Sequence, residues 1–335
     1  MFVTNALADR PDEGTLRLAR EVATVSQAAG ASVVSLDETT SPLARKAMVD
    51  PALLRALRAK PGTPVVYLPT QSLTLGTLVR AAVLRLAGRA DVTVIATQPR
   101  PLPGGMARWS RVAKGLRVLT PSVAVLDQWP GSRFLPMGID LDAFRPVAAA
   151  RKAALRTGHG VPADAKVVLH VGHLTANRNL GWLADTASPD VTVIVVGSER
   201  FGADAAVRQK LEAAGVDVRT GYVADIAELY QLADVYAFPV LSDEGAIGIP
   251  LSVLEAMACG LPVVTTPFGG LPRMVQPGGG VWFAADQAAF DAAVGQALAA
   301  PAKSVQTRRT VSRFTWAEAL SPVTDLLQAK VVTAR

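Results

Sequence analysis

Short apolar runs rich in valine and isoleucine alternate along this chain with longer segments whose apolar residues recur at helical spacing. In the first half, strands are expected at residues 2–4, 32–35, 63–68, 92–96, 117–120 and 133–135, and helices at 15–28, 51–59 and 75–89. Strands that alternate with helices of this length are typical of a parallel sheet covered by helices on both faces.

The same alternation restarts after a break at residues 140–146, which lead into a polar helix expected at 148–157. In this second half, strands are expected at 166–171, 191–196, 217–220, 235–238, 262–265 and 281–284, and helices at 180–186, 203–214, 226–232, 251–258 and 287–299. We therefore expect an α/β protein of two Rossmann-like domains, residues 1–147 and 148–313, whose parallel sheets face each other across a cleft. A last helical pattern, near 314–332, is expected to pack back on the first domain.

The composition agrees with two folded domains. Half of the 335 residues are hydrophobic and 19% are charged, which is enough apolar material for two buried cores and disfavours a disordered chain. The one cysteine, Cys259, cannot form an internal disulfide, so we expect a buried residue in a reducing compartment rather than a nucleophile. The three histidines come without cysteine pairs, and we expect no metal site. With neither a leader pattern after Met1 nor about 20 consecutive apolar residues, a cytoplasmic protein is expected.

The positive charge is unevenly distributed along the chain. The net charge is +6, and the segment from Gly76 to Arg117 alone carries eight basic residues against the single acid Asp91. A helix at 75–89 would place five apolar residues on one face with arginines elsewhere: Leu75, Leu78, Val79, Ala82 and Leu86. Two interpretations stay open. The helix is half-buried with a solvated basic face, or the segment binds an anionic membrane surface or a lipid-phosphate acceptor at the inner face of the membrane. Nucleic acid is disfavoured because Trp109 is the only aromatic residue in the segment.

Four sequence segments between Leu135 and Val275 carry a family pattern. They are LPMGID at 135–140, HVGHL at 170–174 followed by an arginine, GYV at 221–223 with LY and ADV downstream, and EAMACGLPVV at 255–264. Together they resemble the retaining glycosyltransferases of family four, also called glycosyl transferases group 1. The resemblance implies the GT-B fold and transfer of a sugar from a UDP- or GDP-sugar to a hydroxyl acceptor. It also implies a role in cell-envelope, polysaccharide or glycolipid synthesis, a lipid-linked acceptor among the options, and no cofactor.

The resemblance assigns the charged part of a donor site. Arg178 stands where the family has its phosphate-binding lysine, and His173 stands where it has an arginine. Both are therefore expected to bind the donor diphosphate. Glu255 matches the glutamate that accepts hydrogen bonds from the ribose hydroxyls. A simpler interpretation of Arg178, a solvated surface residue, stays open.

Glycine and backbone positions complete the expected donor site. Gly14 follows the first strand, where the family's glycine lets the backbone approach the donor phosphate, and Gly248 opens the segment that leads to Glu255. The base is expected to be read by backbone near Val223. Gly14 could instead be an ordinary turn residue, and Ser252 with Glu255 also fits a capping box.

The chain departs from the family at two places. Ile247 occupies the position of a glutamate that contacts the donor sugar, and the nearest acid is Glu244, eleven residues before Glu255. Our hypothesis is that Glu244 contacts the sugar in its place. The acceptor-cleft histidine is also missing, and the corresponding strand ends offer Thr70 and Gln98 as acceptor-binding residues.

The expected chemistry follows from the same resemblance. Retaining enzymes of this type are similar to ones that need no enzymic nucleophile, because the leaving phosphate deprotonates the acceptor. Stabilisation of the departing diphosphate by Arg178, with Glu244 at the sugar, would then carry catalysis. Two alternatives remain: a non-catalytic relative that binds a nucleotide sugar, which the departures at Ile247 and His173 keep open, and an epimerase or phosphorylase of the same fold, for which no convincing set of acid–base residues is present.

Overall fold

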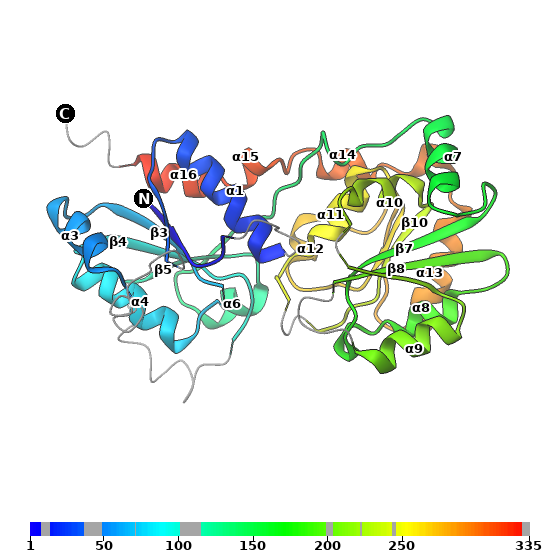
Figure 1. Ribbon diagram of the computed structural model, residues 1–335, viewed down its shortest axis with the longest axis horizontal. Coiled ribbons are helices and arrows are strands. Elements are labelled where there is room, and N and C mark those ends of the chain that lie inside the picture. Colours follow the sequence, from blue (N-terminus) through cyan, green and yellow to red (C-terminus); the bar gives the residue numbers. More distant parts are fainter. Residues whose placement is uncertain are drawn as a thin grey trace. The chain divides into compact units, whose positions relative to one another are not determined.

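A computed structural model describes residues 1–7, 14–36, 49–70, 72–100, 115–198, 204–221, 223–242 and 246–329 (Figure 1). The chain divides into two compact units. The first comprises residues 1–138, 243–249 and 316–335, and the second comprises residues 139–242 and 250–315.

The first unit is built on a six-stranded parallel sheet. Its strands, in order across the sheet, are β2 (Val33–Ser35), β1 (Phe2–Thr4), β3 (Pro64–Leu68), β4 (Asp91–Ile95), β5 (Arg117–Thr120) and β6 (Arg133–Phe134). Its helices are α1 (Gly14–Ala28), α3 (Pro51–Ala59), α4 (Leu75–Leu86), α6 (Val123–Gln128), α15 (Trp316–Ala319) and α16 (Ser321–Gln328). Helices α1 and α16 cover one face of the sheet, and α3, α4 and α6 cover the other (Figure 1).

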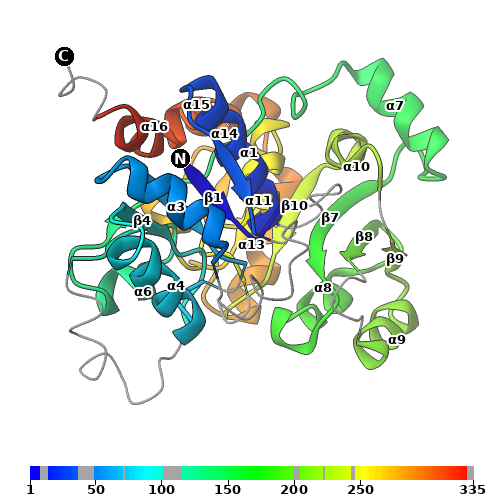
Figure 2. The same ribbon diagram turned by 60° about the vertical axis from the view of Figure 1, so that its left-hand side comes forward.

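The second unit repeats this architecture with a different strand order. Across the sheet the strands are β12 (Val281–Phe283), β11 (Val263–Thr265), β10 (Val235–Phe238), β7 (Lys166–His173), β8 (Val191–Ser198) and β9 (Asp217–Thr220), all parallel. The helices are α7 (Ala149–Gly158), α8 (Gly181–Thr186), α9 (Ala205–Ala213), α10 (Ile226–Leu232), α11 (Leu251–Ala258), α12 (Leu271–Met274), α13 (Gln287–Ala299) and α14 (Thr307–Val311). Two 3₁₀ turns, η1 (Ala176–Arg178) and η2 (Ala302–Ser304), complete it. Figure 2 shows α8 and α9 below β7 and β8, and α7 and α10 above them.

Local sequence signals explain where these elements begin. Helix α3 starts after Asp50, whose side chain accepts a hydrogen bond from the Ala52 N–H at 2.7 Å, and Pro51 takes the first helical position. The helix then buries Leu53 and Leu57 against the sheet. The valine-rich runs form the strands, and all twelve expected strands are found in the described residues within two residues of their expected ends.

Helix α4 differs from its sequence-based description in two respects. It ends at Leu86 rather than at residue 89, because the chain turns through Gly88 and Arg89, which has a φ of 55°. A Cβ at Gly88 would lie 2.5 Å from the Leu84 carbonyl oxygen. The expected single apolar face is also wrong: Leu78 is buried with Ala81 and Leu84, whereas Leu75 and Val79 are each 41% exposed and Leu86 is 70% exposed. Helix α4 therefore has a second apolar stripe that faces solvent.

The carboxy-terminal segment of the first unit packs closely on Gly138. A Cβ at Gly138 would lie 2.6 Å from the Cα of Trp316 and 2.5 Å from its indole ring. Helix α16 then contacts α1 and β3. Only a residue without a side chain allows Trp316 to come this close, so glycine at position 138 is required for the packing of α15 in the first unit.

We expect Gly138→Ala to lower the free energy of unfolding by about 1–3 kcal/mol, because the added methyl group meets backbone that cannot move freely. Gly295→Ala is the matched control. Gly295 lies inside α13, and a methyl group added there meets open space, so this substitution is expected to stabilise the protein by about 1 kcal/mol. Urea unfolding of the two variants measures both effects, and equal stabilities would contradict the close-packing account.

Candidate functional site

The strand order of the second sheet indicates where a ligand would bind in that unit. From β7 the chain moves outward through β8 and β9, then returns to place β10, β11 and β12 on the other side of β7. The strand order therefore reverses between β7 and β10. In open parallel sheets, ligands bind outside the carboxyl ends of the strands at such a reversal. His173 is the last residue of β7, so it lies at this edge.

Arg178 lies just beyond β7, at the end of the 3₁₀ turn η1. Its backbone N–H donates to the Thr175 carbonyl oxygen at 3.0 Å, and Asn179 follows with a φ of 57°. Arg178 is only 7% exposed, which excludes the solvated surface position that the sequence left open. Burial lowers the pKa of Arg178 from its ordinary value, but a guanidinium stays charged at neutral pH. The structure thus places a buried permanent cation in the turn that follows β7, the strand that ends with the half-exposed His173.

Glu255 lies in the middle of α11 and is held by a buried tyrosine. Helix α11 begins after Pro250 without a side-chain cap, so the alternative capping box of Ser252 and Glu255 is wrong. The Glu255 side chain is half-buried, and its Oε2 accepts a hydrogen bond of 2.8 Å from the Tyr230 hydroxyl. Burial, together with the negative charge of Glu255, raises the pKa of Tyr230 well above its ordinary value, so the tyrosine stays a donor.

A row of aromatic side chains connects Glu255 with the end of β7. The Tyr230 and Tyr236 ring centroids are 5.7 Å apart, and Tyr236 stacks on His170 at 6.4 Å with an interplanar angle of 16°. The Tyr236 hydroxyl donates to the Val171 carbonyl oxygen at 3.2 Å. Sequence reasoning missed this row, although two tyrosines six residues apart in a chain with only 5% aromatic residues were a signal that could have been used.

His170 lies under this edge as a neutral buried side chain. It is 1% exposed, and burial lowers its pKa to about 4 despite a 2.9 Å hydrogen bond between Nδ1 and the Ala237 carbonyl oxygen. The nearby positive charge of Arg178 contributes a smaller lowering. At neutral pH the ring is uncharged, so Nδ1 carries the proton that it donates to Ala237.

In the first unit, Gly14 and Gly248 meet other residues of the carboxyl edge of the first sheet. Gly14 is the first residue of α1, and a Cβ there would lie 2.9 Å from Cγ2 of Ile247. The Gly248 N–H donates to the Thr97 carbonyl oxygen at 2.9 Å, and a Cβ at Gly248 would lie 2.6 Å from the Pro121 carbonyl oxygen. Gly248 is therefore required by its close approach to backbone, whereas a side chain at Gly14 would have to displace the side chain of Ile247.

Thr70 and Gln98 lie at the same edge of the first sheet. The Thr70 hydroxyl donates to the Asn5 carbonyl oxygen at 2.8 Å, which joins the ends of β1 and β3, where the strand order reverses. The Gln98 carbonyl oxygen accepts from the Ser72 hydroxyl at 2.6 Å, and Gln98 is 9% exposed. Ser72 is buried with a φ of 57°, an uncommon conformation for a residue with a side chain.

Other predicted features are only partly covered by the structure. Glu244 lies outside the described residues, as does the part of the basic segment at 101–114. Val223 follows β9 as a half-buried residue. Within the described ranges, no group of three or more histidine, cysteine or acidic residues could hold a metal ion. No helix in the described part of the chain combines the length and apolar character that crossing a bilayer requires. Cys259 is buried as expected, and burial raises its pKa to about 12.

Comparison with known sequences finds a family likeness over residues 165–300, most of which belong to the second unit. Residues 165–300 match the family described as Glycosyl transferases group 1. The D-inositol 3-phosphate glycosyltransferases of Mycobacterium tuberculosis and Mycobacterium bovis are 36% identical over 152 residues, a match that covers 42% of this chain and 30% of the relative. The chain thus aligns with less than a third of the length of these relatives.

Comparison with solved structures extends over the whole chain. HepE from Anabaena in complex with UDP and glucose has a TM-score of 0.70 at 17% identity, covering 100% of this chain and 99% of that one. A glycosyltransferase from Rickettsia africae has a TM-score of 0.75 at 14% identity, again covering 100% and 99%. Sucrose-phosphate synthase from Thermosynechococcus elongatus has a TM-score of 0.73 at 19% identity, covering 99% of each chain. The chain therefore has the GT-B fold, which confirms the expected fold class.

The buried His170 predicts a pH-dependent stability. Its ordinary pKa of 6.5 is lowered to about 4 in the folded chain. Between these values the unfolded chain binds a proton that the folded chain does not. Stability is therefore expected to fall by up to about 3 kcal/mol as the pH is lowered through this window. Denaturant unfolding at pH 7 and pH 4 should show a smaller loss for His170→Asn, whose amide can still donate to Ala237. An equal loss in both proteins would contradict the prediction.

Proposed function

We propose that this protein is a retaining glycosyltransferase of family four that transfers a sugar from a UDP- or GDP-sugar to a hydroxyl acceptor. Cell-envelope, polysaccharide or glycolipid synthesis is the proposed setting. One observation carries the proposal: in the second unit, Glu255 of α11 accepts a hydrogen bond from Tyr230 of α10, and Arg178 is buried beyond β7, at the edge where the strand order reverses. A carboxylate for a ribose diol and a cation for a diphosphate are the two groups that a nucleotide-sugar donor requires.

Each donor group has a proposed partner among these residues. The Glu255 carboxylate accepts hydrogen bonds from the ribose hydroxyls, while Arg178 and His173 bind the diphosphate. Backbone near Val223 reads the base. In the first unit, Gly14 begins the 15-residue helix α1, whose free N–H groups attract phosphate. Other HepE structures contain UDP and UDP-glucose, which supports a uridine donor as the first to test.

The proposed reaction needs no nucleophile from the protein. The bond between the sugar C1 and the diphosphate oxygen breaks, and the acceptor oxygen bonds to C1 on the same face. The acceptor proton passes to the leaving phosphate. Arg178 stabilises the charge that develops on the diphosphate, which is where such catalysis gains most. Thr70 and Gln98 are proposed acceptor contacts, Glu244 a proposed sugar contact, and the reaction is proposed to need no metal.

One observation favours a second function, nucleotide-sugar binding without transfer. The position where the family has a sugar-contacting glutamate holds Ile247, and its side chain packs against Gly14. An apolar contact there leaves the sugar without its usual partner. Binding and transfer must therefore be measured separately.

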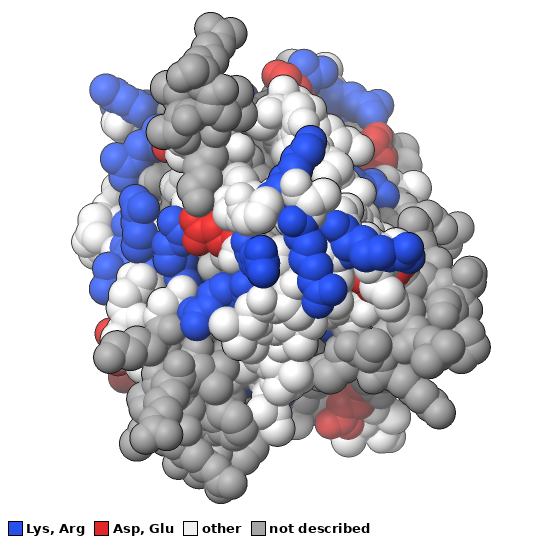
Figure 3. Space-filling view, turned by 90° about the vertical axis from the view of Figure 1, so that its left-hand side faces the viewer, with Lys and Arg blue, Asp and Glu red and all other residues white. Residues whose placement is uncertain are grey.

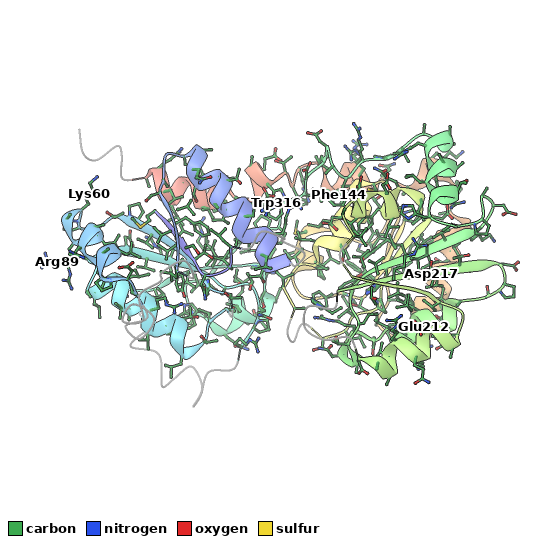
Figure 4. All side chains as sticks on the ribbon, in the orientation of Figure 1. Lys60, Arg89, Phe144, Glu212, Asp217 and Trp316 are labelled. Atoms are coloured by element: carbon green, nitrogen blue, oxygen red, sulfur yellow. The ribbon has the colours of Figure 1, made fainter. Side chains whose placement is uncertain are left out.

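Nucleotide binding tests the donor site. Glu255→Gln is expected to weaken binding of UDP or GDP about 10-fold, because a hydrogen bond to a charged group contributes about 1.5–3 kcal/mol. Glu212→Gln, on the exposed face of α9 and paired with Arg208, is the matched control and should leave binding unchanged (Figure 4). Isothermal titration calorimetry gives both affinities. Wild-type protein that binds neither nucleotide would refute the proposed function.

Release of nucleoside diphosphate tests transfer in the same preparations. UDP-glucose, UDP-N-acetylglucosamine and GDP-mannose, each in EDTA, cover both bases. We expect the wild type to hydrolyse one of these three nucleotide sugars slowly, and we expect the Glu244→Gln variant to lose this hydrolysis. Activity untouched in Glu244→Gln would remove the proposed sugar contact, and tight binding without any release would favour the non-catalytic function.

The first unit also supports a membrane surface as a partner. From residue 51 to residue 90 the chain has six basic residues and no acidic one: Arg55, Arg58, Lys60, Arg80, Arg85 and Arg89. The Arg58 Nε donates to the Ala87 carbonyl oxygen at 2.6 Å, which brings the ends of α3 and α4 together. Lys60 and Arg89 project from this end (Figure 4), and basic side chains spread over the face seen in Figure 3. The exposed Leu86 lies at the end of α4, so one surface combines positive charge with an apolar residue.

We therefore expect the wild type to co-sediment with vesicles that contain anionic phosphatidylglycerol, and to be released by high salt. Arg55→Glu with Lys60→Glu should weaken this binding at least 10-fold, since each basic residue contributes about 1 kcal/mol near such a surface. Leu86→Ser should weaken it less and without changing the salt dependence. Lys303→Glu, an exposed residue of the second unit, is the control. No binding of the wild type to anionic vesicles would rule out a membrane partner.

A further inference from the structure

The packing around Tyr230 restricts its side chain to one orientation. Its ring is completely buried and contacts two other rings: Phe144, at a centroid distance of 5.7 Å and an interplanar angle of 79°, and Tyr236, also at 5.7 Å. Close packing around a completely buried ring restricts its rotamers. The hydroxyl therefore projects from a rigid base, and it donates to Oε2 of Glu255 at 2.8 Å.

Glu255 by itself would lack such a fixed direction. A glutamate side chain has several rotatable bonds, and a half-buried one on a helix surface samples many rotamers unless a partner restrains it. A donor held by packing removes that freedom before any ligand arrives. A carboxylate offers about four acceptor lone pairs, so the hydrogen bond from Tyr230 leaves it able to accept from a ligand diol.

We infer that Tyr230 is a positioning residue for nucleotide binding, which holds the Glu255 carboxylate in the orientation that accepts the ribose hydroxyls. The inference rests on the proposed function, since it assigns Glu255 the ribose. It adds a residue from another element, α10, to the donor site. It also predicts that the contribution of Tyr230 to binding passes entirely through the sugar hydroxyls of the nucleotide.

A purely structural role of the same contact has different consequences. A buried hydroxyl needs a hydrogen-bond partner, and Glu255 could serve only to satisfy Tyr230. Removing the hydroxyl would then lower stability and leave the affinity for every nucleotide alike. Affinity for a nucleotide that lacks the ribose hydroxyls separates the two roles, because only positioning makes the loss depend on those hydroxyls.

Tyr236 provides a matched control in the same row of aromatic side chains. It too is completely buried and contacts Tyr230, but its hydroxyl donates to the Val171 carbonyl oxygen rather than to Glu255. Tyr236→Phe removes one buried hydroxyl from the same place in the core as Tyr230→Phe does. Both substitutions keep the ring, so both variants are expected to fold.

The experiment measures the affinities of wild type, Tyr230→Phe and Tyr236→Phe for UDP and for 2′,3′-dideoxy-UDP, and for the corresponding guanosine pair. Thermal melting of each variant reports its stability. Tyr230→Phe is expected to bind the ribose nucleotide about 10-fold more weakly and the dideoxy nucleotide within twofold of wild type. Tyr236→Phe should keep the wild-type ratio of the two affinities, whatever its change in melting temperature.

Two outcomes overturn the inference. If Tyr230→Phe weakens binding of both nucleotides equally, or of neither, the contact with Glu255 is structural and the inference alone fails. If the wild type binds none of the four nucleotides, the proposed function fails and the inference fails with it. Preserved ribose dependence in the wild type together with its loss in Tyr230→Phe supports both.

Discussion

The end of the backbone pairing between β7 and β10, after Leu169 and Tyr236, is the constraint on which the candidate donor site depends. Strand β7 stays in register with β8 along its whole length, from Lys166 to His173. Its register with β10 comprises the pairs Val168–Val235 and Leu169–Tyr236. Beyond them, side chains join the two strands: His170 bonds to the Ala237 carbonyl oxygen, and Tyr236 bonds to the Val171 carbonyl oxygen. The buried rings of His170 and Tyr236 therefore lie where the strand order reverses, near the edge at which open parallel sheets bind ligands.

Two hydrogen bonds from other helices hold α11 in place, one near its middle and one at its end. Near its middle, Tyr230 donates to Glu255. At its end, the Arg308 guanidinium of α14 donates to the Ala258 carbonyl oxygen at 2.6 Å, where a helix leaves its last carbonyl groups without partners. The same guanidinium donates to the Phe144 carbonyl oxygen at 2.8 Å, and the Phe144 ring packs on Tyr230. Arg308 thus holds both the helix that carries Glu255 and Phe144, the residue whose ring packs on Tyr230.

The sequence predicted the secondary structure and the fold more completely than it predicted the side-chain contacts of the candidate site. Runs of valine and isoleucine located the strands because a strand buried on both faces tolerates little else. The motif placed Arg178 and Glu255, but the hydrogen bond from Tyr230 joins residues 25 positions apart and depends on how α10 packs beside α11. The exposed stripe of α4 was missed for a similar reason. Periodicity shows that a helix has apolar residues, but only the packed structure shows which of them the sheet covers.

This chain has an isoleucine at position 247, where the family that it resembles has an acid, and this difference changes which contacts the position can make. That segment belongs to the first unit, where the Gly248 N–H bonds to the Thr97 carbonyl oxygen and Ile247 lies against Gly14. An acid at position 247 would bring a charge into this close contact, where desolvation is costly. The isoleucine instead closes the contact with apolar surface and offers a sugar no polar group of its own. The residues of the second unit that are proposed to bind the nucleotide, Arg178 and Glu255 among them, are the same whatever residue occupies position 247. Under the proposed function, base and ribose recognition are therefore retained, and sugar recognition has to come from other residues than in the family that the sequence resembles.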